Sequence, residues 1–370
     1  MKHVVVVAND TTVGYIFRKE IIMGLISSGY KVTFIGEPLL FSRNLESLGC
    51  QVLPVDTRRH GKNAFRDMML FYRYYILLRR CAPDVVLTFN IKPNVYAGMA
   101  CRMLGIPYYP NITGLGSPLS YPGFLQRLTI LLYRIGIKKA PAVFFQNADN
   151  ERFFYNNKLL SASTESILLP GSGVNLEQHS LEPYPGECEK LLFLVVGRIM
   201  RDKGTDEILY AAKKIKQEYP NVTFRFLGEH DGGYEQKIME AARQGIIEYA
   251  GRVVDVHSHM KQCHAIVHAS YFEGMANVLL ECAACGRPII ATNIPGCIET
   301  FDEGVFGISC KVKDGDSLAS AIRKFIELPY AEKEQMGLAG RAKVQKCFDR
   351  QIVVNKYLET IEKNKVEIRL

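Results

Sequence analysis

The sequence has no long apolar run, no internal repeat and no low-complexity tract. Because a helix needs about 20 mostly apolar residues to cross a bilayer, we expect no membrane-spanning helix. The lack of a repeat excludes solenoids and propellers, and the lack of biased tracts argues against long disordered segments. An apolar content of 48% and a charged content of 23% are ordinary for a globular protein. The length of 370 residues suits two domains, each with its own core.

Several motifs with a defined chemistry are also missing. The segment NDTTVG (9–14) follows the first predicted strand but is not GxGxxG, so a nicotinamide dinucleotide is weakly supported. The eight histidines form no HExxH motif, and we expect His257 and His259 at a surface, without a role. Cys282 and Cys285 form a CxxC with no second pair, which favours structural cysteines over a zinc site.

The beginning of the chain and the cysteines indicate a cellular location. Residues 1–8 run directly into a predicted strand, so we expect no signal peptide. The ten cysteines are scattered, and the simplest interpretation is reduced thiols in a cytoplasmic protein.

Basic charge is concentrated in the first half. Residues 1–170 contain 20 Lys and Arg against 10 Asp and Glu, whereas the whole chain has a net charge of only +8. This excess indicates a membrane surface, a nucleic acid or a phosphorylated substrate as partner, or else a solvated face. Segments 64–81 and 124–140 mix apolar residues with Arg and Lys, as helices in a membrane interface or over a sheet do. We expect an anionic membrane partner on the inner face of the plasma membrane, and no nucleic acid.

The first half alternates strand and helix patterns, which predicts an α/β fold. Continuous β-branched or apolar runs, typical of doubly covered parallel strands, lie at 3–8, 31–36, 84–89 and 142–147. The segments between them are helical in pattern, so we expect an open parallel sheet with helices on both faces.

The second half repeats this pattern. We predict strands at 191–197, 223–228, 265–270 and 287–292, and helices at 205–219, 278–286 and 317–328. PGSGVN (170–175) separates the halves, which gives domains 1–175 and 176–350. We expect the final segment, 351–370, to be helical and to pack back on the first domain. Two Rossmann-like domains facing each other would enclose a cleft, with ligands at the carboxyl ends of the strands.

The strongest candidate site is EGMANVLLE (273–281). Glu273 and Glu281 are eight residues apart, which brings both toward one face of a helix. The amides of Gly274, Met275 and Ala276 would lie at the positive N-terminus of that helix, where phosphate binds well. This spacing suits a sugar-phosphate-ribose ligand, although two solvated glutamates on an ordinary helix would look the same.

Two loops complete the candidate site. In VVGRIMRDKG (195–204), Arg198 and Lys203 follow a predicted buried strand, where two cations can neutralise a diphosphate or simply be solvated. In the first domain, Gly14 allows a ligand close to the backbone. Asp314 and Asp316 imitate a metal-binding DxD, but we expect a turn and a helix cap there.

These motifs resemble glycosyltransferase family 4, which has the GT-B fold. The resemblance is carried by GRIMRDKG, by the segment 270–300 with its Glu-x7-Glu and by 302–322. TFNIKPNVYAG (88–98) and NITGLGS (111–117) resemble bacterial enzymes that build polysaccharides on polyprenyl-diphosphate lipids, including N-acetylhexosaminyltransferases.

The resemblance implies a role for each matched residue. Arg198 and Lys203 would hold the donor diphosphate and Glu281 the ribose, while Glu273 would contact the donor sugar. The remaining donor contacts would come from Arg252 and Val253 at the base, expected to be uracil, and from Gly14, Gly274, Met275 and Ala276.

The acceptor side departs from the family pattern. Many members have a first-domain histidine where this chain has Asn111-Ile-Thr113, so Asn90, Lys92, Asn111 and Thr113 are the candidate acceptor-binding residues. With no obvious carboxylate nucleophile in that domain, a retaining same-face transfer is favoured over a covalent intermediate. Catalysis would then rest on Glu273, Arg198 and Lys203, with a UDP-sugar donor, a lipid-linked saccharide acceptor and no essential metal or cofactor.

Two other functions fit this architecture. A UDP-sugar 2-epimerase would need acid and base groups but no acceptor, and a non-catalytic scaffold would only bind a sugar nucleotide. The basic first domain and the Arg198, Lys203, Glu273 and Glu281 set favour a transferase.

Overall fold

The computed structural model describes residues 1–57, 64–116, 119, 122–187, 190–231 and 233–367. The chain divides into two compact units. Unit 1 comprises residues 1–172 and 350–370, and unit 2 comprises residues 173–349. Each unit has its own parallel sheet with helices on both faces, which confirms the predicted α/β class with two Rossmann-like domains.

Unit 1 contains a seven-stranded parallel sheet with strand order β3-β2-β1-β4-β5-β6-β7. Its strands are β1 (His3–Asp10), β2 (Lys31–Glu37), β3 (Gln51–Pro54), β4 (Val85–Phe89), β5 (Tyr108–Ile112), β6 (Ala142–Phe145) and β7 (Glu165–Leu168). Its helices are α1 (Thr11–Ser27), α2 (Ser42–Ser47), α3 (Ala64–Cys81), the π-helical turn η1 (Pro93–Ala97), α4 (Gly98–Leu104), α6 (Phe124–Gly136), α7 (Ala148–Asn156) and α14 (Arg350–Glu367).

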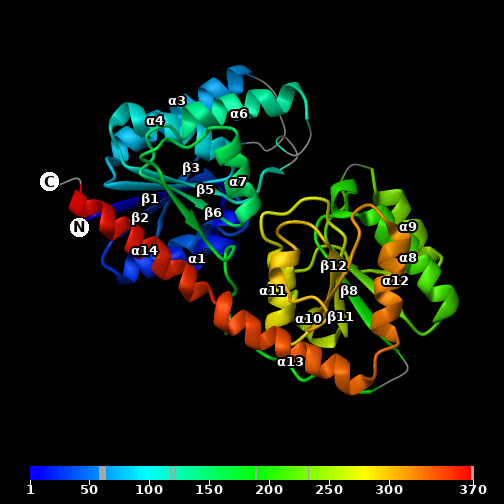
Figure 1. Cartoon of the computed structure of the whole chain (residues 1–370). Coiled ribbons are helices and arrows are strands. Elements are labelled where there is room, and N and C mark those ends of the chain that lie inside the picture. Colours follow the sequence, from blue (N-terminus) through cyan, green and yellow to red (C-terminus); the bar gives the residue numbers. More distant parts are fainter. Residues whose placement is uncertain (58–63, 117–118, 120–121, 188–189, 232, 368–370) are drawn as a thin grey trace. The chain divides into compact units, whose positions relative to one another are not determined.

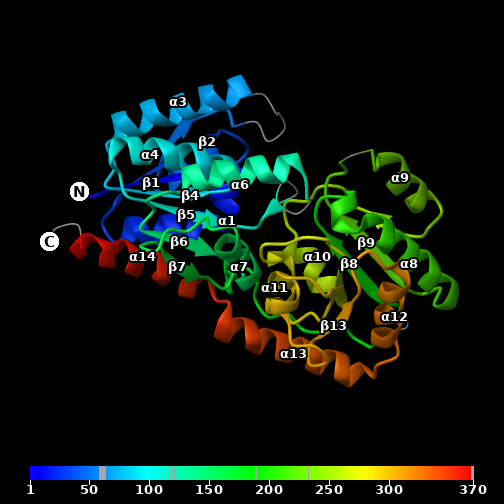
Figure 2. The same cartoon turned by 45° about the horizontal axis from the view of Figure 1, so that its top comes forward.

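Alternate residues of β1 supply the cores on the two faces of this sheet. Val4 and Val6 pack with α1 and α14, whereas Val5 and Val7 pack with α3, α4 and α6. Figures 1 and 2 show the same division, with α3, α4 and α6 together on one face of the sheet. The continuous apolar run at 3–8 therefore reflects a strand buried on both sides.

Unit 2 contains a six-stranded parallel sheet with strand order β10-β9-β8-β11-β12-β13. Its strands are β8 (Leu192–Val196), β9 (Thr223–Leu227), β10 (Glu248–Tyr249), β11 (Ala265–His268), β12 (Ile289–Thr292) and β13 (Gly307–Cys310). Its helices are η2 (Arg201–Lys203), α8 (Thr205–Glu218), α9 (Glu235–Arg243), α10 (His257–Gln262), α11 (Asn277–Ala284), η3 (Ile298–Thr300), α12 (Gly315–Ile326) and α13 (Tyr330–Cys347). Helices α8 and α12 pack together, as do α11 and α13 (Figure 1).

The chain passes between the units at two points. Unit 1 ends at Ser172, before the predicted boundary at 175, because the amide of Val174 donates to the carbonyl of Phe348 at 2.8 Å within unit 2. After Asp349, α14 packs on unit 1, where Arg350 forms an ion pair with Glu20 at 2.8 Å. Residues 368–370 of the predicted helical segment lie outside the described residues.

Candidate functional site

The candidate donor site lies at the carboxyl edge of the unit 2 sheet. The first strand of this unit, β8, lies beside β11, and the chain continues to opposite sides from these two strands. Such a switch point is where ligands bind in open α/β sheets. Arg198 and Lys203 follow β8, and Glu273 follows β11, so the topology brings these predicted residues to the same edge.

A close backbone approach fixes the loop that carries Lys203. Gly204 has a φ of 66°, and a Cβ there would lie 2.1 Å from the carbonyl oxygen of Ala269. The amide of Tyr271 donates to the carbonyl of Asp202 at 2.8 Å. The glycine in GRIMRDKG is therefore needed to hold Lys203 against the segment that contains Glu273.

Glu273 is the centre of a charged cluster. Lys203 Nζ forms an ion pair with Glu273 Oε1, and His268 Nε2 lies 2.9 Å from the same oxygen. Burial alone raises the pKa of Glu273, but the charge of Lys203 and the hydrogen bond from His268 outweigh it, so the pKa lies below its usual range. An ionised carboxylate only accepts hydrogen bonds, so His268 Nε2 must carry a proton and donate.

The start of α11 differs from the prediction. The helix begins at Asn277, so Glu273 lies in the preceding loop and not on one helix face with Glu281. The amide of Ala276 is already engaged, since it donates to the carbonyl of Gly296 at 2.7 Å. The predicted set of three phosphate-binding amides at Gly274, Met275 and Ala276 is therefore wrong for Ala276. Glu281 is half-buried within α11.

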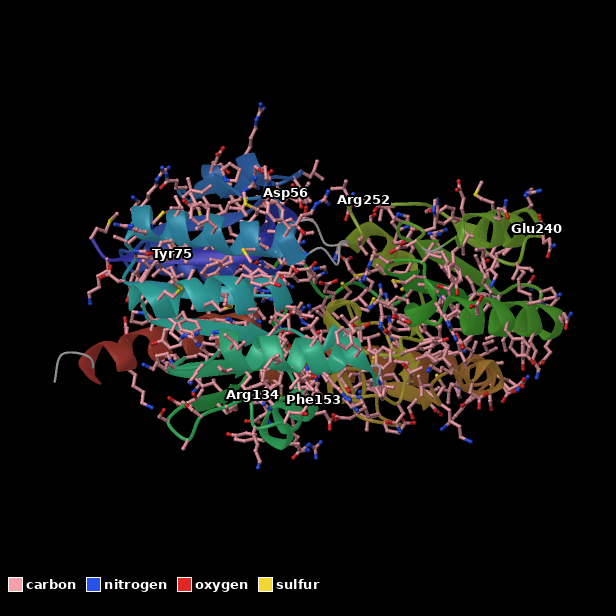
Figure 3. The ribbon with its side chains drawn as sticks, turned by 90° about the horizontal axis from the view of Figure 1, so that it is seen from above. Asp56, Tyr75, Arg134, Phe153, Glu240 and Arg252 are labelled. Atoms are coloured by element: carbon pink, nitrogen blue, oxygen red, sulfur yellow. The ribbon has the colours of Figure 1, made fainter. Side chains whose placement is uncertain are left out.

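The other predicted donor residues lie in loops that follow strands at the same edge. Arg198 is exposed, and its guanidinium lies 3.7 Å from Asp231. Arg252, labelled in Figure 3, follows β10 and forms an ion pair with Glu229 at 3.0 Å. Val253 packs against the core of unit 2. Both arginines can exchange these partners for a ligand at little cost, because exposed ion pairs contribute little free energy.

Gly14 does not have the predicted position. Asp10 caps α1 by accepting a hydrogen bond from the amide of Val13 at 2.9 Å, so α1 begins at Thr11 and includes Gly14. A Cβ on Gly14 would lie 2.5 Å from the ring of Phe34. Gly14 therefore allows α1 to pack closely on β2, and the predicted approach of a diphosphate to its backbone is wrong.

Three of the four predicted acceptor residues lie at the carboxyl edge of the unit 1 sheet. Asn90 follows β4 with a φ of 73° and accepts a hydrogen bond from the amide of Asn9, near the end of β1, at 3.4 Å. Thr113 follows β5 and is half-buried. Lys92 Nζ lies 3.2 Å from Asp67 of α3. Ser117, at the end of the NITGLGS motif, lies outside the described residues.

Asn111 is not placed to bind an acceptor. Its side chain is 2% exposed within β5, where its amide group donates to the carbonyls of Thr88 and Tyr109 at 3.2 Å. The hydroxyl of Tyr357, on α14, donates to its side-chain oxygen. Asn111 ties α14 to the sheet, so its prediction as an acceptor residue is wrong.

Two further predictions, for His257 and for Asp314 after β13, can be compared with the structure. His257 was predicted to lie at a surface, but its ring is half-buried and lies 2.9 Å from Glu182 and 3.3 Å from the Cys285 thiol. Asp314 caps α12 by accepting from the amide of Ser317 at 2.8 Å, which confirms the predicted helix cap.

Sequence reasoning missed His268, although it lies in the predicted strand 265–270. The only signal was a polar residue near the carboxyl end of an apolar run. A parallel α/β unit with a cation, a buried carboxylate and a helix start at its switch point is typical of proteins that bind nucleotide phosphates.

Comparison with known families gives the class. The family model for group 1 glycosyl transferases matches residues 184–343, and the model for glycosyl transferase 4-like domains matches residues 5–147. The chain therefore belongs to the glycosyltransferases. Its first domain matches the glycosyl transferase 4-like model, and its second domain matches the group 1 model.

Individual relatives agree with this assignment. The chain is 25% identical, over 94% of its length and 95% of the relative's, to the N,N'-diacetylbacillosaminyl-diphospho-undecaprenol alpha-1,3-N-acetylgalactosaminyltransferase of Campylobacter jejuni. It is 29% identical to the Staphylococcus aureus capsular polysaccharide biosynthesis glycosyltransferase CapM, over 78% of this chain and 79% of CapM.

Solved structures agree on the fold. A glycosyltransferase from Rickettsia africae superimposes with a TM-score of 0.77 at 18% identity, covering 98% of both chains. Anabaena HepE, solved with UDP and glucose, gives a TM-score of 0.78 at 17% identity, covering 98% of this chain and all of HepE. The GT-B fold is thereby confirmed.

Proposed function

We propose that this enzyme transfers a sugar, an N-acetylhexosamine, from a UDP-sugar to a polyprenyl-diphosphate-linked saccharide, with retention of anomeric configuration. The observation that carries the proposal is the Lys203–Glu273–His268 cluster at the switch point of unit 2. The donor and acceptor classes are supported by the name of the Campylobacter relative, which specifies an undecaprenyl-diphosphate-linked acceptor, and by the UDP bound to HepE.

In the proposed mechanism, Lys203 exchanges the Glu273 carboxylate for the donor diphosphate as its anionic partner. Without donor, its ammonium group is neutralised by Glu273. The donor diphosphate would recruit Lys203 and Arg198, which stabilise the negative charge that grows on the leaving phosphate. Glu273, held by His268, would then orient the donor sugar, and Glu281 would accept hydrogen bonds from the ribose.

A retaining transfer without a covalent intermediate fits the groups at the carboxyl edge of unit 1. Asp10, which ends β1, is 4% exposed and already caps α1. The departing diphosphate would itself receive the proton of the acceptor hydroxyl as that hydroxyl attacks from the same face. Asn90, Lys92 and Thr113 are the residues proposed to position the acceptor.

Cationic side chains at the diphosphate make an essential metal unnecessary in this mechanism. We expect Mg²⁺ or Mn²⁺, added to enzyme first treated with EDTA, to leave kcat unchanged. A rate restored only by Mn²⁺ would contradict metal-independent transfer.

The acceptor is proposed to reach the enzyme at an anionic membrane surface. None of the helices in the described part of the chain is long and apolar enough to cross a membrane. Two helices on the same face of the unit 1 sheet, α3 and α6, instead present a mixed apolar and basic surface; Figure 3 labels Tyr75 of α3 and Arg134 of α6. Its exposed members are Phe65, Arg66, Met68, Met69, Tyr72 and Arg73 on α3, and Phe124, Leu125, Arg127, Leu128, Leu131 and Arg134 on α6.

One assay separates this proposal from its alternatives. The enzyme is incubated with a panel of UDP-sugars, with and without a polyprenyl-diphosphate-linked saccharide, and the product's anomeric configuration is read by NMR. Transfer only in the presence of acceptor, with retained configuration, is expected. Conversion of the UDP-sugar without acceptor would indicate an epimerase. The absence of both transfer and donor hydrolysis across the panel would indicate a binding scaffold.

A further inference from the structure

Unit 2 contains a second cluster of reactive side chains, at the other end of α11 from Gly274. His179, His257 and Cys285 come from three separate segments, and one possible ligand atom of each lies within 4.8 Å of the other two. Cys285 Sγ is 3.3 Å from His257 Nδ1, and the rings of His179 and His257 meet edge to face with centroids 5.8 Å apart. Because α11 has eight residues, its ends are separated by about 12 Å.

The carboxylate of Glu182 orients the central histidine. His257 Nε2 lies 2.9 Å from Glu182 Oε1, which leaves Nδ1 directed at the Cys285 thiol. Lys261 Nζ lies 3.3 Å from the other oxygen of Glu182, so this carboxylate is held between two nitrogen donors and accepts from His257 Nε2. A carboxylate on the outer nitrogen of a histidine is the arrangement that fixes the tautomer of metal-binding histidines.

Two arginines hold the backbone around the cluster. The Arg341 guanidinium donates to the carbonyls of His179 and Ala284, both at 2.9 Å. Arg287 donates to the carbonyls of Glu182 and Cys285 at 3.2 and 3.0 Å. It also donates to the carbonyls of Met260 and Lys261, in the helix that carries His257, at 3.0 and 2.8 Å. The segments that carry the three side chains are thus tied together by bonds that do not involve the side chains themselves, so the cluster is preorganised.

We propose that His179, His257 and Cys285 form a zinc site. The 3.3 Å between Cys285 Sγ and His257 Nδ1 fits two ligands of a tetrahedral Zn²⁺, whose bonds to nitrogen and thiolate sulfur are about 2.0 and 2.3 Å long. The His179 ring nitrogen, within 4.8 Å of both, would move closer when the metal binds. On binding, the Cys285 S–H bond breaks, its electron pair forms the bond to zinc and the proton passes to solvent. A water molecule completes the four ligands. The site joins the chain entering unit 2 to α10 and to α11, the helix that carries Glu281.

Cobalt spectroscopy on the full chain, without an added affinity tag, tests this proposal. Metal-free protein is titrated with Co²⁺, which reports a bound thiolate through a sulfur-to-cobalt charge-transfer band. One equivalent of Co²⁺ is expected to saturate this band, and Zn²⁺ is expected to displace the cobalt and raise the Tm. Absence of the band in the wild-type protein would overturn the proposal, as would binding of several equivalents without it.

The CxxC motif provides a matched control. Cys282 lies one turn earlier on α11 and is fully buried in the core. Cys285→Ser is expected to abolish the charge-transfer band and the rise in Tm with Zn²⁺, whereas Cys282→Ser keeps both. If the Cys285 variant does not fold, His257→Gln serves in its place and is expected to weaken Co²⁺ binding at least tenfold. Equal Co²⁺ affinity and an unchanged band in the Cys285 or His257 variant would overturn the assignment. Neither result bears on the sugar transfer proposed above.

Discussion

The Lys203 side chain is only 27% exposed, and its ammonium group forms an ion pair with the Glu273 carboxylate. In the proposed mechanism it stabilises charge that develops on the leaving diphosphate. Lys203→Ala is therefore expected to lower kcat/KM about 100-fold or more, as the loss of one such donor does in other enzymes. The measurement is the steady-state rate of transfer, with the Tm recorded to show that the variant is folded.

Lys214→Ala is the control for this substitution. Lys214 also belongs to unit 2 and forms an ion pair, with Asp316 at 2.8 Å, but on the exposed surface between α8 and α12. We expect its kcat/KM to stay within a fewfold of wild type. The same small effect for Lys203→Ala would remove Lys203 from the catalytic site.

A substitution at Gly14 tests whether this residue serves packing or donor binding. Its position against Phe34 predicts that Gly14→Ala lowers the free energy of unfolding by about 1–3 kcal/mol, because the added methyl group overpacks the interface of α1 and β2. The Kd for UDP is expected to stay unchanged. Denaturant unfolding and UDP titration measure the two effects. Gly186→Ala is the neutral control, because no atom of the described residues lies within 4 Å of the added Cβ. A weakened UDP affinity without loss of stability would restore Gly14 to the donor site.

At the residue scale, the sequence predicted that Lys203 and Glu273 meet at one sheet edge, but it misplaced Asn111. Lys203 and Glu273 follow predicted apolar strands, and the carboxyl ends of parallel strands meet at one edge whatever the details of packing. Asn111 was misplaced because a polar side chain within β5 looks the same in sequence whether it faces a substrate or Tyr357. That difference depends on α14, which lies about 240 residues further along the chain.

The helix α14 covers one face of unit 1. Its Tyr357 ring packs against Phe144, with ring centroids 4.5 Å apart, and its hydroxyl donates to Asn111. Tyr357→Phe leaves the buried side-chain oxygen of Asn111 without this donor. We expect the free energy of unfolding to fall by about 1–3 kcal/mol, as measured by denaturant unfolding, with KM for the acceptor unchanged. An altered acceptor KM with full stability would indicate that Asn111 acts on substrate after all.

The exposed apolar stripe of α6 is the element that the membrane proposal depends on. Leu128 and Leu131 are 39% and 48% exposed, beside Arg127 and Arg134. Replacing both leucines with Ser is expected to reduce flotation with anionic liposomes at moderate salt at least severalfold, because it removes apolar area that the interface would bury.

Leu338→Ser is the control for α6, since Leu338 is 46% exposed on α13 of unit 2. Its flotation is expected to equal that of the wild type. A wild-type chain that does not float at all, or an α6 variant that floats equally well, would contradict the membrane proposal.

At the element scale, the sequence predicted the central strands and missed the edges. β1, β2 and β4 are buried on both faces and give long apolar runs. The edge strands β3, β7 and β10 have only two to four residues, partly exposed, so no apolar run distinguishes them from loops. β5 was missed for a different reason: Pro110 within it is unfavourable for a central strand.

At the scale of the whole molecule, each unit has a switch point in its sheet. The predicted acceptor residues Asn90, Lys92 and Thr113 lie near the switch point of unit 1, and the predicted donor residues lie near that of unit 2. In unit 1 the switch point is between β1 and β4, where Asn9 meets Asn90, and in unit 2 between β8 and β11, where Lys203 meets Glu273. The cleft between facing domains stays a prediction from the resemblance. The two α/β domains could be predicted because the apolar pattern of each strand or helix depends on which of its faces is buried, and that pattern is visible in each local segment of the sequence.

A crystal structure of the enzyme with UDP tests the central claim most directly. The account predicts the diphosphate within hydrogen-bonding distance of Lys203 Nζ at the carboxyl edge of β8, with the ribose hydroxyls at Glu281 and the Lys203–Glu273 contact lengthened. A nucleotide bound at another edge of either sheet, with Lys203 still paired to Glu273, would contradict it.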